Sequence, residues 1–241
     1  MPAKKTETIV IKPLKMEKVK IRVVGDSPLI MHAWSAKAKR DILSKEIGIT
    51  KMTKSIRNPF EDFATSMYWL DQMPEEPDEK SVTEALSAGV RFGFPLTAFK
   101  QAAISSAYRL GWAKDKMSLR GAFFIDPDQD GYYGGDLKID LDRKEIEIVP
   151  NVYRYEPMVE IHSDIPLIRE DCVRVGMGTD LRYRGEFRNW YADLTVSFNA
   201  NGQYTLDQII NLINAGGTVC GVGEWRPERD GQYGMFHVDA K

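Results

Sequence analysis

The C-terminal part of the sequence most constrains the fold, because it predicts a strand, a helix, a glycine-rich loop and a second strand in that order. Residues 190–198 (WYADLTVSF) alternate apolar and polar side chains, as a strand with one buried face does. Thr205 and Gln208 have the spacing of a capping box, which predicts a helix to about Asn214. Residues 234–238 predict the closing strand. Such a unit requires a sheet that the helix can cover on one face.

The remainder of the chain predicts more elements of both kinds. Residues 19–24 (VKIRVV) alternate like a strand, and Ser35 is placed to cap a helix over residues 36–46. Asn58 is expected to cap a second helix that runs to about Met73. A third helix is expected over residues 98–110, with Thr97 as its cap. Other strands are predicted over residues 89–94, 122–125, 137–141, 145–149 and 152–161, and loops over 74–80 and 126–135. This mixture predicts the α+β class.

Composition limits the classes of protein that fit. The chain has 241 residues, with 33 Lys and Arg against 35 Asp and Glu. Residues 1–60 carry 14 basic against five acidic side chains, so this quarter is strongly basic and the rest acidic. Two cysteines offer neither a disulfide framework nor a zinc set, and no apolar run matches a membrane helix or a signal peptide. We therefore expect a cytoplasmic protein that does not bind membranes.

Common catalytic and cofactor motifs are missing from the sequence. It contains no phosphate-binding P-loop, zinc-protease helix, hydrolase elbow or C-x-x-C pair, and no cofactor or metal is expected. Asp126, Asp128 and Asp130 copy the first half of a calcium loop, but Leu137 stands where the pattern needs a bidentate glutamate. A turn is therefore the favoured interpretation of this segment.

Six glycines fall within residues 216–234, and the first two, Gly216 and Gly217, are expected to end the preceding helix. Glycines let a backbone approach a ligand closely, while arginines bind phosphates and aromatic rings stack on bases. The loop contains Trp225, Arg226, Arg229 and Tyr233. A ligand-binding loop and a plain connection to the last strand both remain open.

Two further segments could contact an anion. Residues 169–188 interleave arginines with aromatic residues, although four acids in the segment also allow surface ion pairs. Lys100 lies in the first turn of a predicted helix, where free amide groups favour an anion.

In this order the segments resemble those of the RAMP superfamily, particularly the backbone subunits of CRISPR effector complexes. The anchors are the turn and Pro-Leu of residues 25–29, the helix start at Pro95 with Lys100, the R-x-R segment, and the final glycine loop G-h-G-x-x-R-P. They are scattered over most of the chain, and the closest likeness is to a stand-alone relative carried by a phage or prophage.

The resemblance implies a ferredoxin-like (RRM-like) antiparallel sheet with helices on one face and a thumb-like insertion. It implies one domain, 1–241, with insertions at roughly 50–90 and 120–185. Members bind RNA along its backbone, often as a filament. The glycines of the family's loop correspond to Gly221, Gly223, Gly231 and Gly234. The candidate nucleic-acid-binding residues are Lys37, Lys39, Arg40, Lys100, Arg174, Arg182, Arg184, Arg188, Gly221, Gly223, Trp225, Arg226 and Arg229.

Three functions follow as hypotheses. The first is a non-enzymatic protein that binds single-stranded nucleic acid, RNA in preference to DNA, without sequence specificity and assembles with copies of itself along the strand. The second is a phage or prophage subunit that contacts other proteins and no nucleic acid. The third is a metal-independent ribonuclease with His32, the one histidine in a basic setting, as general acid or base. His162 and His237 are expected to be structural or surface residues.

Overall fold

The structure is a computed structural model that describes residues 13–48, 57–143, 145–176 and 178–239. Its central element is a sheet of four antiparallel strands in the order β11-β1-β10-β5. The strands are β1 (Met16–Gly25), β5 (Phe123–Asp126), β10 (Tyr191–Asn199) and β11 (Phe236–Val238). The helix α4 (Leu96–Arg109) lies between β1 and β5 in the chain, and α6 (Leu206–Val219) between β10 and β11. The protein is therefore of the α+β class, as the sequence predicts.

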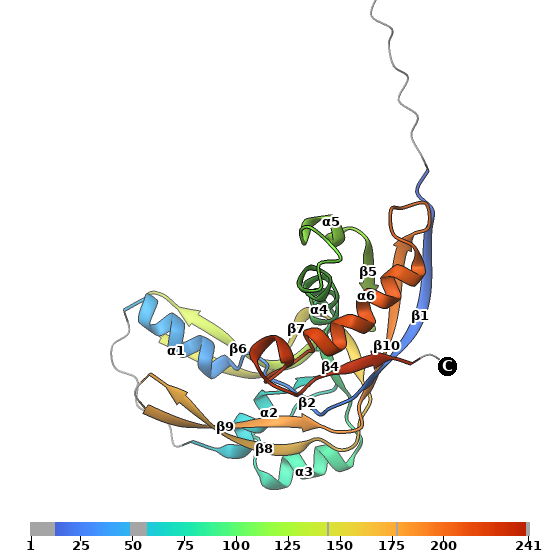
Figure 1. The fold of residues 1–241 in the computed structure, drawn as a ribbon. Coiled ribbons are helices and arrows are strands. Elements are labelled where there is room, and N and C mark those ends of the chain that lie inside the picture. The colour runs from blue at the N-terminus through green and yellow to red at the C-terminus, as the bar shows by residue number, and fades with distance from the viewer. Residues whose placement is uncertain (1–12, 49–56, 144, 177, 240–241) are drawn as a thin grey trace, which may run out of the picture.

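Apolar and charged side chains alternate along β1, and this alternation gives the sheet one buried face. Ile21 and Val23 are buried, whereas Lys20 and Arg22, which alternate with them, are exposed. Both helices cover the buried face (Figure 1). Phe99 of α4 meets Phe236 of β11 edge to face, with ring centroids 5.6 Å apart. One continuous apolar core thus joins the sheet to both helices.

The four strands of the central sheet and the helices α4 and α6 make a unit of six elements, and two insertions interrupt it. The first, between β1 and α4, contains β2 (Leu29–Ile30), α1 (Ala36–Glu46), α2 (Pro59–Thr65), β3 (Tyr68–Trp69), α3 (Glu79–Ser87) and β4 (Phe92–Pro95). The second, between β5 and β10, contains β6 (Gln129–Asp140), β7 (Glu145–Ile161), β8 (Leu167–Val175) and β9 (Gly178–Phe187). Two short helices, α5 (Met117–Arg120) and the 3₁₀ turn η1 (Pro227–Arg229), complete the described elements.

The strands of the insertions form two further sheets. One is a closed barrel of four strands in the order β3-β4-β7-β6. The other is a three-stranded sheet in the order β2-β9-β8. The long β6–β7 hairpin and α1 project together to one side of the molecule, and the β8–β9 hairpin runs below them (Figure 1). Among the described residues, no helix is long and apolar enough to cross a membrane.

The capping signals give the most accurate sequence predictions. Ser35 caps α1, whose bounds match the prediction, and Asn58 caps α2 with Pro59 in its first turn. The capping box of Thr205 and Gln208 opens α6. These predictions are confirmed because a cap depends on neighbouring residues alone.

Several predicted helix ends were wrong. The helix that begins at Pro59 ends at Thr65, before the short strand β3, and not near Met73. Thr97 does not cap α4, because the helix begins two residues earlier than predicted, at Leu96, with Pro95 at its N-cap. Gly216 and Gly217 do not end α6, which continues to Val219. A Cβ at Gly217 would lie 1.8 Å from the carbonyl oxygen of Phe236, so this glycine serves close packing.

Three other segments were also predicted wrongly. Residues 79–87, for which the sequence predicts no helix, form α3 with a capping box between Asp78 and Ser81. Residues 129–135, expected to be loop, belong to β6, and register shifts next to Gly131 and Gly134 each leave one extra residue on the partner strand β7. The two strands predicted over 145–149 and 152–161 are one strand, β7.

Candidate functional site

The glycine-rich loop (residues 220–234) is bound to the turn that follows β1. The amide of Gly234 donates to the carbonyl of Pro28 at 2.8 Å, and the amide of Glu224 donates to the carbonyl of Ile30 at 2.9 Å. Within the loop, the amide of Val222 donates to the carbonyl of Gly234 at 2.9 Å. These bonds fix the loop against the segment that carries His32.

Trp225 has an unusual conformation in this loop. Its φ is +53°, a left-handed value that a bulky side chain rarely adopts. Its carbonyl accepts from the amide of Tyr233 at 3.0 Å, which holds the backbone in place. Trp225 is 38% exposed, and its indole N–H donates to Asp171 at 3.3 Å. Backbone strain of this kind is often retained where a side chain must be presented to a ligand.

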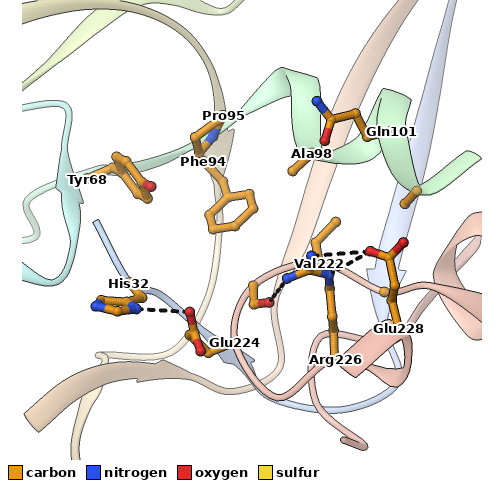
Figure 2. A pocket seen from close by; sticks show the side chains of 13 residues that line it. His32, Tyr68, Phe94, Pro95, Ala98, Gln101, Val222, Glu224, Arg226 and Glu228 are labelled. Carbon is orange, nitrogen blue, oxygen red and sulfur yellow. Dashed lines mark hydrogen bonds and ion pairs between the residues drawn. The ribbon is translucent and has the colours of Figure 1, made fainter. Parts of the chain in front are cut away.

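A cavity of about 210 Å³ lies between the loop, the start of α4 and the segment after β2. Figure 2 shows His32, Tyr68 and Gln101 on its walls, with Glu224, Arg226 and Glu228 contributed by the loop. Because no described side chain caps α4, its first amide groups are uncapped at the edge of this cavity. Arg226 is oriented by Glu228 at 3.2 Å and by the carbonyl of Gly223 at 2.9 Å.

His32 and Glu224 form a pair at the mouth of the cavity, as Figure 2 shows. Nδ1 of His32 lies 2.9 Å from Oε1 of Glu224, and both side chains are more than a third exposed. The hydrogen bond to His32 holds the pKa of Glu224 below its ordinary value, although partial burial opposes this. Tyr68 lies deeper, where burial raises the pKa of its hydroxyl. A carboxylate that orients an imidazole is an arrangement used in proton transfer.

The β8–β9 hairpin contacts the other side of the loop through charged side chains. Arg169 bonds to Asp171 and Glu186 at 2.9 Å each, and its guanidinium lies 4.5 Å from the ring centroid of Tyr233. Arg184 is only 5% exposed and pairs with Asp171 at 3.4 Å, and its buried Nε has no partner among the described residues. Burial lowers the pKa of Arg184, while Glu224 and Asp171 raise it. Arg184 is therefore a buried cation that links the two strands of the hairpin and lies in the field of Glu224 from the loop.

The structure thus brings together one part of the predicted site. Gly221, Gly223, Trp225, Arg226 and Arg229 share the loop, and Arg184 reaches it from β9. Arg182 and Arg188 lie on the same strand as Arg184 or just beyond its end, paired with Asp180 and Glu186 at 2.8 and 2.7 Å. Among the described residues, Arg229 has no ion-pair partner, and its side chain is exposed.

The remaining candidates lie elsewhere. Lys100 does not line the cavity; its ammonium lies 4.2 Å from the ring centroid of Phe124 on the edge strand β5. Lys37, Lys39 and Arg40 are on α1, in the projecting part of the molecule (Figure 1). Arg174 is at the tip of the β8–β9 hairpin, where it donates to the carbonyl of Gly176.

Much of the basic charge near the N-terminus is neutralised within the sheet. Lys18 pairs with Asp126 at 2.7 Å, and Arg22 makes two bonds to Asp193 at 2.7 and 3.0 Å. Arg57 similarly pairs with Asp62 and Asp180. Five more of the 14 basic residues, at positions 4, 5, 12, 51 and 54, lie outside the described residues. The charge asymmetry of the sequence therefore reflects, in part, pairing between distant segments.

Sequence reasoning missed Glu224, Tyr68 and Asp171. Glu224 is 192 positions from His32, and no local spacing connects them. Asp171 belongs to a strand that the sequence did not predict. No protein-family model matches this chain, and no curated protein matches it.

Proposed function

We propose that the protein binds single-stranded nucleic acid, RNA in preference to DNA, without sequence specificity, and that copies assemble along the strand. The proposal includes a ferredoxin-like core, which the strand order β11-β1-β10-β5 with two crossover helices supports. The preference for RNA and the assembly along it rest on the resemblance to the RAMP superfamily.

The observation that carries the proposal is the junction of the glycine loop with the β8–β9 hairpin. There, Trp225 has a strained backbone and a partly exposed side chain, and its indole bonds to Asp171, the carboxylate that pairs with Arg169 and Arg184. A stacking face beside cationic side chains is what a sequence-independent single-strand site requires. Glu224, Glu228 and Asp171 reduce the net positive charge, so we expect stacking to contribute alongside phosphate binding.

Charge reversal at an exposed arginine tests the site without disturbing its interior. Arg184→Glu would bury a second acid beside the half-buried Asp171, and Arg188→Glu would place one beside the buried Glu186. Arg229 is exposed and has no ion-pair partner among the described residues, so we expect Arg229→Glu to weaken binding of all single-stranded sequences without loss of the fold. The slope of log K against log salt should flatten by about 0.7 for each phosphate that the variant no longer neutralises.

The matched control for this experiment is Arg120→Glu, which reverses an exposed arginine on α5, remote from the loop. Fluorescence anisotropy with labelled oligonucleotides of different sequence measures both variants. Equal affinities for Arg229→Glu and the control would contradict the assignment of the site.

A ribonuclease is the second candidate, because His32 has a carboxylate partner at the mouth of a cavity. Cleavage by this pair predicts that His32→Ala abolishes activity on single-stranded RNA while binding persists. Glu224→Gln should lower the rate less, since the amide can still orient the ring. Incubation of labelled RNA in EDTA measures cleavage without metal, and full cleavage by His32→Ala would exclude this function.

A further inference from the structure

The edge of β1 that faces away from β10 is only partly covered. β11 pairs with Val23, Val24 and Gly25 alone, whereas β10 pairs with β1 along nearly its whole length. Within the described part of the chain, no strand lies beside residues 16–20 on this side. An uncovered strand edge presents amide and carbonyl groups that can pair with another extended segment.

The hydrogen bonds at the two ends of β1 identify the backbone groups that point to this edge. The carbonyl of Arg22 accepts from Asp239 on the β11 side, while that of Lys15 accepts from Ala200 on the β10 side, both at 2.8 Å. In an antiparallel strand the direction alternates with each residue. Met16, Lys18 and Lys20 therefore direct both their N–H and C=O groups to the uncovered edge.

Side chains leave this edge accessible. Lys18 reaches across β10 to Asp126 on β5, and Lys20 pairs with Asp193 on β10, so both ammonium groups are drawn away from the edge. Lysines often prevent strand addition when they guard an edge, and here their charges are paired elsewhere. Beside the edge, a hollow of about 860 Å³ has Ile21, Ile210 and Val238 among its lining residues. The other lining residues are charged or amide side chains, among them Arg22, Asn211 and Asn214, so the edge offers backbone pairing beside a surface with three apolar residues.

The chain contains a segment suited to this edge. Residues 6–11 (TETIVI) are all β-branched except for Glu7, a composition that favours a strand. Ile9 and Ile11 are two positions apart, so in an extended conformation they would share one face. Two isoleucines on one face can pack against the three apolar side chains of the hollow. This segment precedes β1 in the chain and lies outside the described residues.

The chain leading into β1 is held on the wrong side for the segment to pair with its own edge. The carbonyl of Pro13 accepts from the side chain of Asn201 at 3.1 Å, and the amide of Lys15 donates to Asn199 at 3.0 Å. Both partners follow or end β10, so the chain is bound on the β10 side of β1. A second copy can bring the segment to the uncovered edge without passing around the end of the strand.

We propose that residues 6–11 of one copy add as a strand to the uncovered edge of β1 in a second copy. Donor and acceptor are different surfaces, so the contact is head-to-tail and can continue into a filament. The inference rests on the self-assembly part of the proposed function and specifies how copies join. It requires no nucleic acid, so the two can fail separately.

Complementary variants of the full chain test the proposal. Lys18→Pro removes an edge amide that makes no bond to β10, so the fold should remain while the acceptor is blocked. Lys18→Thr is its control, because it removes the same charge and keeps the amide. The double variant Ile9→Asp, Ile11→Asp removes the donor and leaves every described residue unchanged.

Sedimentation velocity without nucleic acid gives the readout. We expect the parent and Lys18→Thr to form concentration-dependent oligomers, and each blocked variant to be monomeric. An equal mixture of Lys18→Pro with the donor-less variant should form dimers and nothing larger, since one donor meets one acceptor. A monomeric parent, an assembling Lys18→Pro, or a mixture that stays monomeric would overturn strand addition, whatever the protein does with RNA.

Discussion

Gly234→Ala is expected to lower the free energy of unfolding by about 2–4 kcal/mol. Gly234 has a φ of +63°, and a Cβ there would lie 1.7 Å from the carbonyl oxygen of Val222. The variant combines left-handed strain with a clash against backbone that the loop's own hydrogen bonds hold in place. Urea unfolding measures the decrease in the free energy of unfolding.

Gly89→Ala provides the control for backbone strain alone. Gly89 has a φ of +79°, but a Cβ at this position would have no described heavy atom within 4 Å beyond its chain neighbours. We expect a decrease of about 1 kcal/mol, as for alanine in a left-handed position without a clash. Equal decreases for the two variants would show that the loop does not pack as described.

Trp225→Ala is expected to weaken binding of single-stranded RNA by about 5- to 150-fold, since stacking of a base on an aromatic ring contributes about 1–3 kcal/mol. Trp225→Phe should retain most of the affinity, because it keeps a stacking face and removes only the bond to Asp171. Anisotropy titrations at one fixed salt concentration measure both variants.

Two controls separate the indole from general effects of removing a tryptophan. Trp112 is 58% exposed and follows the end of α4, so Trp112→Ala should bind like the parent. Trp225→Gly loses the same side chain but relieves the left-handed strain, so its free energy of unfolding should fall less than that of Trp225→Ala while its affinity falls as much. Parent-like binding by Trp225→Ala would remove this residue from the site.

The starts of several helices could be predicted from the sequence, because helix capping depends on neighbouring residues. Contacts between residues far apart in the sequence could not be predicted. Ser35, Asn58 and Thr205 mark helix starts because capping involves residues two or three positions away. The β8–β9 hairpin escaped prediction because charged pairs such as Arg184 and Asp171 occupy positions where an alternating strand usually has apolar side chains.

The candidate site shows the same division. The glycine loop is evident in the sequence, because six glycines gather within 19 residues, 216–234. The residues that contact this loop are not evident in the sequence. His32 contacts Glu224, and Trp225 contacts Asp171, because the fold brings distant segments together. Lys100 was predicted to contact an anion because it lies in the first turn of a helix. Its ammonium instead lies against Phe124 on the edge strand β5.

Binding across a salt series tests the central claim most directly. Labelled single-stranded RNA, single-stranded DNA and duplex DNA are titrated with the protein, and the complexes are sized. The proposal predicts tight binding of single strands, strongest for RNA, with a steep salt dependence and complexes that grow with strand length. Absence of binding to single strands even at low salt would contradict it and direct the function to a protein partner.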